Sequence, residues 1–163
     1  MAEQARPEVD SRDLRDRILR EATRLFAKKG YNGVSVREIV EAVGTTKPSL
    51  YYYFANKESL FESIVRDSLE QYRARLQSVL ARGLPIREKL VAVAEENFSY
   101  ARENADLSRL TYSVYFSSER NVVDFDLDAF FMSTFALIHD EIEAAMQAGE
   151  LRDGDPWMMT LSF

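Results

Sequence analysis

Residues 35–61 read SVREIVEAVGTTKPSLYYYFANKESLF and decide how the N-terminal part of the chain folds. Ser35 and Glu38 have the S-x-x-E spacing of a capping box, which predicts that a helix begins here. Gly44 supplies a turn, and Pro48 is tolerated in the first turn of a second helix because its missing N–H is not needed there. The segment is therefore expected to form two short helices joined by a glycine turn.

The second of these helices carries consecutive tyrosines, Tyr51, Tyr52 and Tyr53. Successive helical residues point about 100° apart, so at least one of the rings must leave the core. Exposed rings with hydroxyl tips are uncommon without a surface to meet. Leu50 and Phe54 are expected to face the core instead. Because turn-joined helices can place one helix in the major groove of DNA, the segment indicates a DNA-binding protein.

Apolar residues elsewhere recur at spacings of three and four, which predicts an all-α fold. The first helix is expected from about Arg12 and to end at Gly30. Either Thr45 or Thr46 can cap the helix that contains Pro48. Later helices are expected over about 57–80, 86–103, 106–117 and 125–148, with another capped by Asp155. The domains expected are a flexible arm (1–11), a three-helix DNA-binding domain with the helix-turn-helix (12–58), and a helical effector-binding and dimerisation domain (59–163).

The net charge of −6 is unevenly distributed along the chain. Residues 1–61 contain 11 Lys and Arg against 9 Asp and Glu, a balance of +2, while residues 62–163 contain 10 against 18, a balance of −8. Affinity for DNA depends on the phosphates that are neutralised at the contact. A locally basic surface is therefore sufficient for DNA binding, even in a chain of negative net charge. The acidic residues 62–163 are expected to form a second unit with a role other than DNA binding.

Composition narrows the class of protein further. Its 163 residues, 46% of them hydrophobic, can support a buried core, and there are no cysteines, so disulfides and thiolate metal sites are excluded. No N-terminal run resembles a signal peptide, and no stretch approaches the roughly 18 apolar residues of a membrane span. The sequence therefore predicts a cytoplasmic protein without a membrane partner.

Three adjacent stretches resemble the N-terminal DNA-binding domain of TetR-family transcriptional regulators. They are RDRILREATRLFAKKGY, SVREIVEAVG and GTTKPSLYYYFANKESLF, and the resemblance covers about residues 14–61. It implies an all-helical homodimer that represses genes by binding a palindromic operator in double-stranded DNA. It also implies a C-terminal domain that responds to a small-molecule effector.

The resemblance also implies roles for individual residues. The helix that enters the major groove carries Lys47, Pro48, Ser49, Tyr51, Tyr52 and Tyr53. Arg37 matches a position that can reach base edges, and arginine can bond guanine O6 and N7 together. Positions that often touch the phosphate backbone are matched by Ser35, Val36, Tyr51 and Lys57. Ser35 could instead act as a helix cap alone, and Lys57 could be a solvated cation.

Aromatic residues are concentrated in the predicted helices after residue 86. A helical domain lined in this way could hold an apolar or aromatic ligand, although each ring could equally fill a core. The candidate ligand-binding residues are Phe98, Tyr112, Tyr115, Phe116, Phe131 and Phe135. Arg102 or Arg109 could meet an acidic ligand, but a solvated surface role is favoured for both.

No catalytic, cofactor or metal site is expected. Asp124, Asp126 and Asp128 are spaced like the start of a calcium loop, but the glycine and glutamate that such a loop requires are absent, so these acids are expected to cap a helix. His139 and Glu143 share a helical face without a third ligand evident from the sequence. Neither a nucleophile–base pair nor a glycine-rich phosphate loop is apparent, so an enzyme is not expected.

The resemblance further implies that more helices follow WMMTLSF at residues 157–163, so either the C-terminal domain is incomplete or the protein dimerises differently. Two alternatives belong to other functional classes. The chain could be a DNA-bound structural or cell-division protein that uses the same helices without effector-controlled transcription. It could also be a helical ligand-binding module whose N-terminal domain does not bind DNA.

Overall fold

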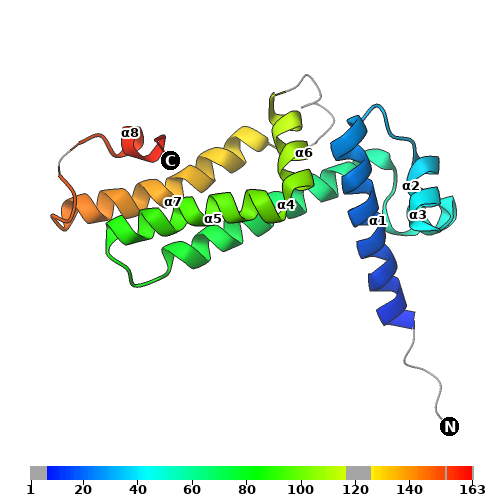
Figure 1. The fold of residues 1–163 in the computed structure, drawn as a ribbon, viewed down its shortest axis with the longest axis horizontal. Coiled ribbons are helices and arrows are strands. Elements are labelled where there is room, and N and C mark those ends of the chain that lie inside the picture. The colour runs from blue at the N-terminus through cyan, green and yellow to red at the C-terminus, as the bar shows by residue number, and fades with distance from the viewer. Residues whose placement is uncertain (1–6, 117–125, 153, 163) are drawn as a thin grey trace, which may run out of the picture. The chain divides into compact units, whose positions relative to one another are not determined.

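The computed structural model describes residues 7–116, 126–152 and 154–162, and within these ranges the regular structure is helical (Figure 1). No β-strand occurs in those ranges, and the prediction of an all-α fold is confirmed. The helices are α1 (Pro7–Lys29), α2 (Val36–Val43), α3 (Lys47–Tyr53), α4 (Lys57–Leu80), α5 (Ile86–Glu103), α6 (Ala105–Phe116), α7 (Leu127–Gln147) and α8 (Pro156–Thr160).

The first helix begins earlier than the sequence predicted. α1 starts at Pro7 and not at Arg12, because proline is tolerated in a first turn, where its missing N–H has no helical partner. Residues 7–11 therefore belong to α1 and not to the predicted flexible arm. Residues 1–6 lie outside the described part of the chain, so the arm stays a prediction there.

The start of α7 confirms the expected helix cap. The side chain of Asp126 accepts a hydrogen bond of 2.9 Å from the backbone N–H of Ala129. A carboxylate at this end also interacts favourably with the helix dipole. Asp124, the first acid of the DFDLD run, lies outside the described residues.

The chain forms two compact units, one from residues 1–68 and 106–125 and the other from residues 69–105 and 126–163. The first unit extends beyond the predicted domain of 12–58 because α4 completes its core. Leu60 and Phe61 in the first turns of α4 are fully buried, and Val65 follows one turn later. The division therefore falls within α4 and not at its start.

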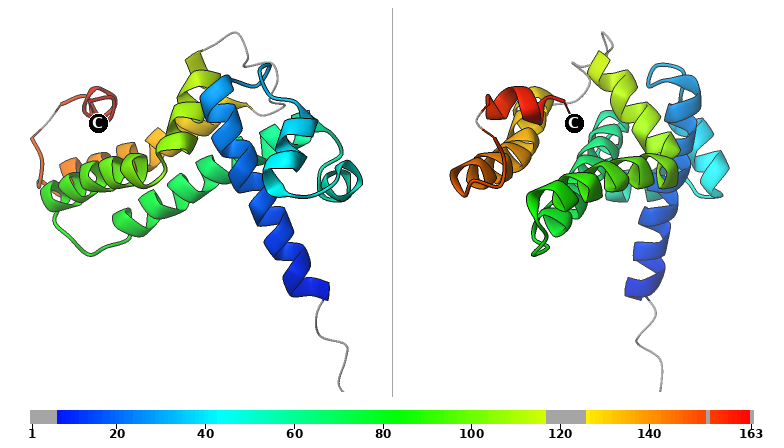
Figure 2. Two further views of the ribbon diagram at one scale, coloured as in Figure 1. Left: turned by 45° about the vertical axis from the view of Figure 1, so that its right-hand side comes forward. Right: turned by 60° about the vertical axis from the view of Figure 1, so that its left-hand side comes forward.

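Aromatic rings form the centre of the first unit. The Phe61 ring meets Phe26 edge-on with ring centroids 5.0 Å apart, and its centroid lies 4.8 Å from that of Tyr31. Ile18 and Ala22 on α1 are fully buried as well. α2 and α3 both pack against α1, and the further views in Figure 2 show these two short helices together beside it. Burial of this apolar surface holds the short α2 and α3 in place.

The core of the second unit lies between the end of α4, α5 and α7. One cluster of buried residues in this core consists of Leu76, Val79, Leu80, Val93, Ile138 and Ile142. An ion pair of 2.6 Å joins Lys89 on α5 to Glu141 on α7, and α8 also packs on α7. Among the helices that the structure describes, none combines the length and apolar character needed to cross a bilayer.

Candidate nucleic-acid interface

The predicted capping box fixes the start of α2. Glu38 accepts hydrogen bonds from Ser35 N at 2.8 Å and from Ser35 Oγ at 2.9 Å, while Ser35 Oγ accepts from Glu38 N at 3.2 Å. The Lys29 ammonium lies 2.6 Å from the same carboxylate. The bond from Lys29, followed by those from Ser35, lowers the pKa of Glu38 to about 2. The turn before α2 is thereby tied to the end of α1.

The turn between α2 and α3 depends on Gly44. Its φ of 72° lies in the left-handed region, which a residue without Cβ adopts readily. Of the two threonines proposed as caps, Thr46 is the one used, because its side chain accepts a hydrogen bond of 3.3 Å from Ser49 N. Arg17 on α1 donates a 2.6 Å hydrogen bond to the Val43 carbonyl at the end of α2. These contacts set the position at which α3 begins.

α3 presents its tyrosines as the sequence predicted. Tyr51 is 47% exposed and Tyr52 80% exposed, whereas Leu50 and Phe54 are 0% and 3% exposed. Tyr53 is half-buried and meets Tyr52 edge-on, with ring centroids 5.0 Å apart. The expectation that at least one ring leaves the core is confirmed.

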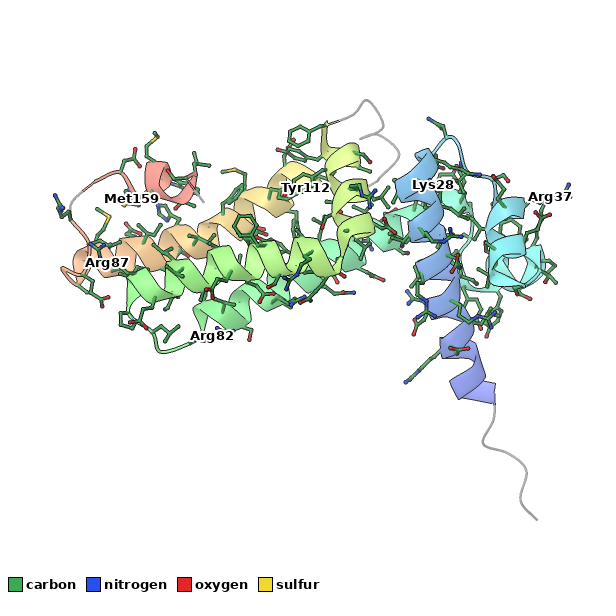
Figure 3. All side chains as sticks on the ribbon, viewed as in Figure 1. Lys28, Arg37, Arg82, Arg87, Tyr112 and Met159 are labelled. Atoms are coloured by element: carbon green, nitrogen blue, oxygen red, sulfur yellow. The ribbon has the colours of Figure 1, made fainter. Side chains whose placement is uncertain are left out.

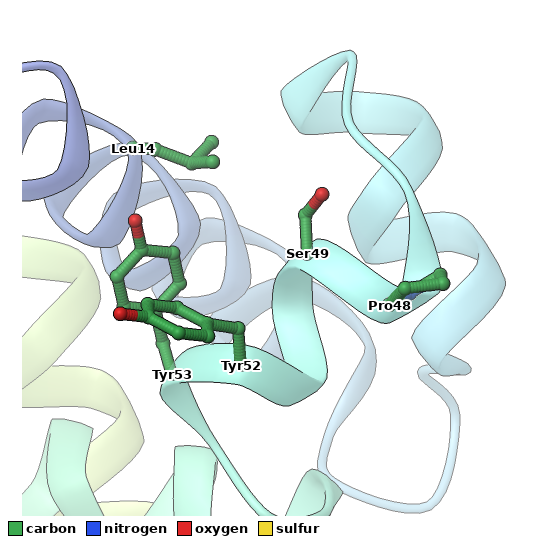
Figure 4. Close-up of a pocket in the computed structure, with 5 residues that line it drawn as sticks. All are labelled: Leu14, Pro48, Ser49, Tyr52 and Tyr53. Atoms are coloured by element: carbon green, nitrogen blue, oxygen red, sulfur yellow. The ribbon is translucent and has the colours of Figure 1, made fainter. Parts of the chain in front are cut away.

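A shallow groove lies beside these rings. It has a volume of about 290 Å³ and is lined by Leu14, Pro48, Ser49, Tyr52 and Tyr53 (Figure 4). Figure 4 shows Leu14 approaching from α1 while the other residues come from α3. Sequence reasoning placed Leu14 only in the apolar stripe of α1. Its partial exposure is set by the packing of α1 against α3, which the sequence did not show.

Cations flank the tyrosines. Lys47 is exposed at the first position of α3, and Arg37 projects outward from α2, as Figure 3 shows. Ser35 is exposed and Val36 half-buried at the start of α2. We call the exposed residues Arg37, Lys47, Tyr51 and Tyr52 the α2–α3 surface. It combines aromatic rings, phenol hydroxyls and two cations, which are suitable groups for contacts with phosphates and base edges.

Lys57 is half-buried and bonded to the backbone, whereas the sequence suggested an exposed cation. Its ammonium donates 3.0 Å hydrogen bonds to the carbonyls of Tyr31 and Val34 and lies 3.9 Å from the centroid of the Tyr31 ring. An ammonium has three donors, and two of them bond to the turn between α1 and α2, while the charge lies over the Tyr31 ring. Lys57 is therefore placed to hold this turn against the start of α4.

Comparison with known proteins agrees with this arrangement of helices. Residues 18–64 match the family model described as bacterial regulatory proteins, tetR family. The chain belongs to the TetR family. The matched residues include α2, α3 and the turns that position them, so the local geometry and the family likeness concern the same segment.

This TetR-family chain is similar to characterised repressors and to solved structures. It is 30% identical to the HTH-type transcriptional repressor KstR2 of Rhodococcus jostii over 109 residues, 67% of this chain and 52% of that protein. The TetR-family regulator PfmR of Thermus thermophilus has a TM-score of 0.75 and 26% identity, over 90% of this chain and 80% of that one.

A second solved structure, AibR in complex with isovaleryl coenzyme A and operator DNA, has a TM-score of 0.72 and 24% identity. That match covers 91% of this chain and 80% of AibR. At this identity the likeness concerns the fold. Among the curated relatives, the matches to KstR2 and to the regulator YdgC of Bacillus subtilis each cover 52% of the relative, so the chain spans about half their length.

The six aromatic ligand candidates of this TetR-family chain are divided between the two units. In the first unit, Tyr112 and Phe116 on α6 are 60% and 77% exposed, and their rings stack with centroids 6.3 Å apart. The half-buried Tyr115 meets Phe116 edge-on at 5.0 Å. These three rings form one cluster at the end of α6.

The other three candidates belong to the second unit. Phe131 and Phe135 are half-buried on α7, whereas Phe98 on α5 is 79% exposed. One buried cluster of that unit consists of aliphatic residues of α4, α5 and α7, and none of these three rings belongs to it. Their role in ligand binding stays a prediction.

The single histidine has more acidic neighbours than the sequence suggested. Potential ligand atoms of His139, Asp140 and Glu143 all lie within 4.8 Å of one another, so Asp140 is the third group that sequence reasoning missed. The His139 ring also packs on Trp157, with ring centroids 4.3 Å apart. This contact gives the histidine a packing role between α7 and α8.

Proposed function

We propose that this TetR-family chain is a cytoplasmic, sequence-specific DNA-binding repressor that binds a palindromic operator as a homodimer. The observation that carries the proposal is the α2–α3 surface. Tyr51 and Tyr52 are exposed on a helix whose other face, with Leu50, is buried against the first unit. A rigid helix with exposed polar aromatics and adjacent cations suits the major groove.

The proposed contacts divide into two kinds. Arg37 and Lys47 read base edges, since arginine and lysine can both bond guanine O6 and N7. Ser35, Val36 and Tyr51 contact the phosphate backbone and set the orientation of α3, which also brings Pro48, Ser49, Tyr52 and Tyr53 to the DNA. We assign Lys57 a supporting role, because two of its three donors bond to the turn before α2.

The proposed effector is small and largely apolar or aromatic. Two proteins of similar fold support a ligand with an apolar part, because AibR was solved with isovaleryl coenzyme A and the regulator FadR of Bacillus subtilis with stearoyl-CoA. The effector and the operator are proposed to favour different spacings of the DNA-binding domains in the dimer. Each ligand then weakens the binding of the other by the same coupling free energy.

Selection of bound sequences from random DNA tests the DNA-binding part of the proposal. The expected result is enrichment of one palindromic motif. Arg37→Ala or Lys47→Ala is then expected to relax the preference at particular positions of that motif, with an effect of about 1–3 kcal/mol. A competition assay in which Arg37→Ala loses specific and non-specific DNA equally would contradict base reading by Arg37.

A ligand screen tests the regulatory part. A compound of the proposed class should release the selected operator, and the operator should reduce the affinity for that compound by the same factor. A ligand that binds without altering operator affinity would contradict the coupling. Operators that lie away from promoters would favour a structural or cell-division role over a repressor.

A further inference from the structure

An exposed acidic residue lies beside the α2–α3 surface. Glu41 lies one turn after Arg37 on α2, and its Oε1 accepts a hydrogen bond of 2.7 Å from Arg37 Nε. The two side chains are 60% and 78% exposed. A carboxylate beside a surface that is proposed to face a polyanion opposes association, so its presence there requires an explanation.

Helix stability does not supply that explanation. Glu41 lies in the last turn of α2 and Arg37 in the first, so each charge faces the helix end that disfavours it. An arginine that precedes a glutamate by four residues is also the weaker orientation of such a pair. The other acid of α2, Glu38, builds the capping box, whereas in the described chain the Glu41 carboxylate bonds to Arg37 alone.

The contact leaves the tip of the arginine available. Nε is held by Glu41, while the Nη1 and Nη2 groups make no hydrogen bond to the described part of the chain. These two groups form the planar end of the guanidinium, which matches guanine O6 and N7 as a bidentate pair. Arg37 is therefore held by its inner edge and presents its outer edge.

We propose that Glu41 is a specificity-determining residue that positions Arg37 for base reading and opposes non-specific contact with phosphates. The inference rests on the proposed DNA-binding function. Bound at Nε, Arg37 loses less conformational freedom when it meets a base. A phosphate in place of that base must approach the carboxylate, and like charges at this distance repel.

The test compares the full-length protein with Glu41→Ala, Glu41→Gln and Arg37→Ala, and with the double variant. Affinities for the selected operator and for unrelated DNA are measured at one salt concentration. Glu95→Gln is the matched control for net charge, because Glu95 is an exposed glutamate on α5. Thermal unfolding, monitored by circular dichroism, checks that each variant is folded.

Glu41→Ala is expected to tighten binding to unrelated DNA and to lower the ratio of specific to non-specific affinity about fivefold. Base preference should relax at the operator position that Arg37→Ala also affects. Glu41→Gln keeps an acceptor for Nε and loses only the charge, so its ratio should fall by less. In the Arg37→Ala background, Glu41→Ala should relax that position no further.

An unchanged ratio in Glu41→Ala, or the same fall in Glu95→Gln, would overturn the role of Glu41. Relaxed base preference that is independent of Arg37 would overturn the positioning role. If the wild-type protein prefers no sequence at all, the proposed function fails together with this inference. If it selects a motif that Glu41→Ala reads equally well, only the inference fails.

Discussion

The ammonium of Lys57 lies 3.9 Å from the centroid of the Tyr31 ring and donates to the carbonyls of Tyr31 and Val34. The contact joins the first residue of α4 to the turn that precedes α2. Tyr31 is itself buried against Phe26 and Phe61, so the lysine is attached to a rigid group. Lys57 therefore contributes to the position of α2 without belonging to it.

Lys57→Met should destabilise the protein by about 1–2 kcal/mol, because two carbonyls lose a charged donor while the aliphatic part of the side chain is retained. Urea unfolding measures the change. Lys47→Met is the matched control, since Lys47 is exposed and should leave the stability nearly unchanged.

The same variant distinguishes support from direct contact with DNA. A lysine that remains in the turn releases no counterion, so Lys57→Met should leave the salt dependence of DNA affinity unchanged. A salt slope that decreases by about one would show that Lys57 contacts a phosphate.

Glu38→Gln should remove part of the pH dependence of stability. The pKa of Glu38 is lowered from 4.5 to about 2, so the stabilisation by its carboxylate is present above about pH 4.5 and is lost as the pH falls towards 2. The difference in unfolding free energy between the wild type and Glu38→Gln should therefore be largest near neutral pH. It should decrease steadily below pH 4.5.

Glu95→Gln serves as the control for that series, because Glu95 is an exposed glutamate outside any capping box. A difference between the wild type and Glu38→Gln that stays constant between about pH 7 and pH 2 would contradict a native-state carboxylate with a lowered pKa.

Gly44→Ala should cost about 1 kcal/mol, because φ is +72° while an added Cβ would meet no atom within 4 Å. The cost therefore comes from the backbone conformation alone. Gly83→Ala is the matched control, since its site is equally open and its φ is not positive. Equal stability of the two variants in urea unfolding would argue against a left-handed residue at this turn.

Tyr52→Phe should weaken DNA binding by about threefold to tenfold for all sequences, because it removes a hydroxyl that can bond to a phosphate and keeps the ring. Competition assays measure the affinity for operator DNA and the affinity for unrelated DNA. Tyr112→Phe removes a hydroxyl from an exposed tyrosine on α6 and should change neither affinity. A change in base preference for Tyr52→Phe would indicate that the hydroxyl reads a base.

Local signals were sufficient to predict most of the helices. The capping box of Ser35 and Glu38 and the left-handed Gly44 are determined by residues within a few positions, so the bounds of α2 followed from the sequence. The burial of Leu50 followed from helical periodicity in the same way. The bonds of Lys57 could not be predicted, because their acceptors lie 23 and 26 residues away along the chain.

The aromatic ligand candidates show a second limit. Phe98 was chosen for its residue type, but the buried residues of α5 are Ile86, Val93 and Tyr100, which recur every seven residues. Phe98 lies two positions from Tyr100 and so points to the opposite side of the helix. Tyr112 is similarly two positions from both Leu110 and Val114, the buried residues of α6. Composition drew attention to these rings, while periodicity would have placed them at the surface.

α4 runs without interruption from Lys57 to Leu80, and the division between the two units falls inside it, after Ser68. At this division the chain is helical, so no loop lies there that could absorb an added or deleted residue. One residue inserted near Ser68 would rotate Leu76 and Val79 by about 100° relative to Phe61. Exchange of DNA-binding domains between relatives would thus have to preserve the helical register of α4, and length changes in evolution should be confined to segments outside it.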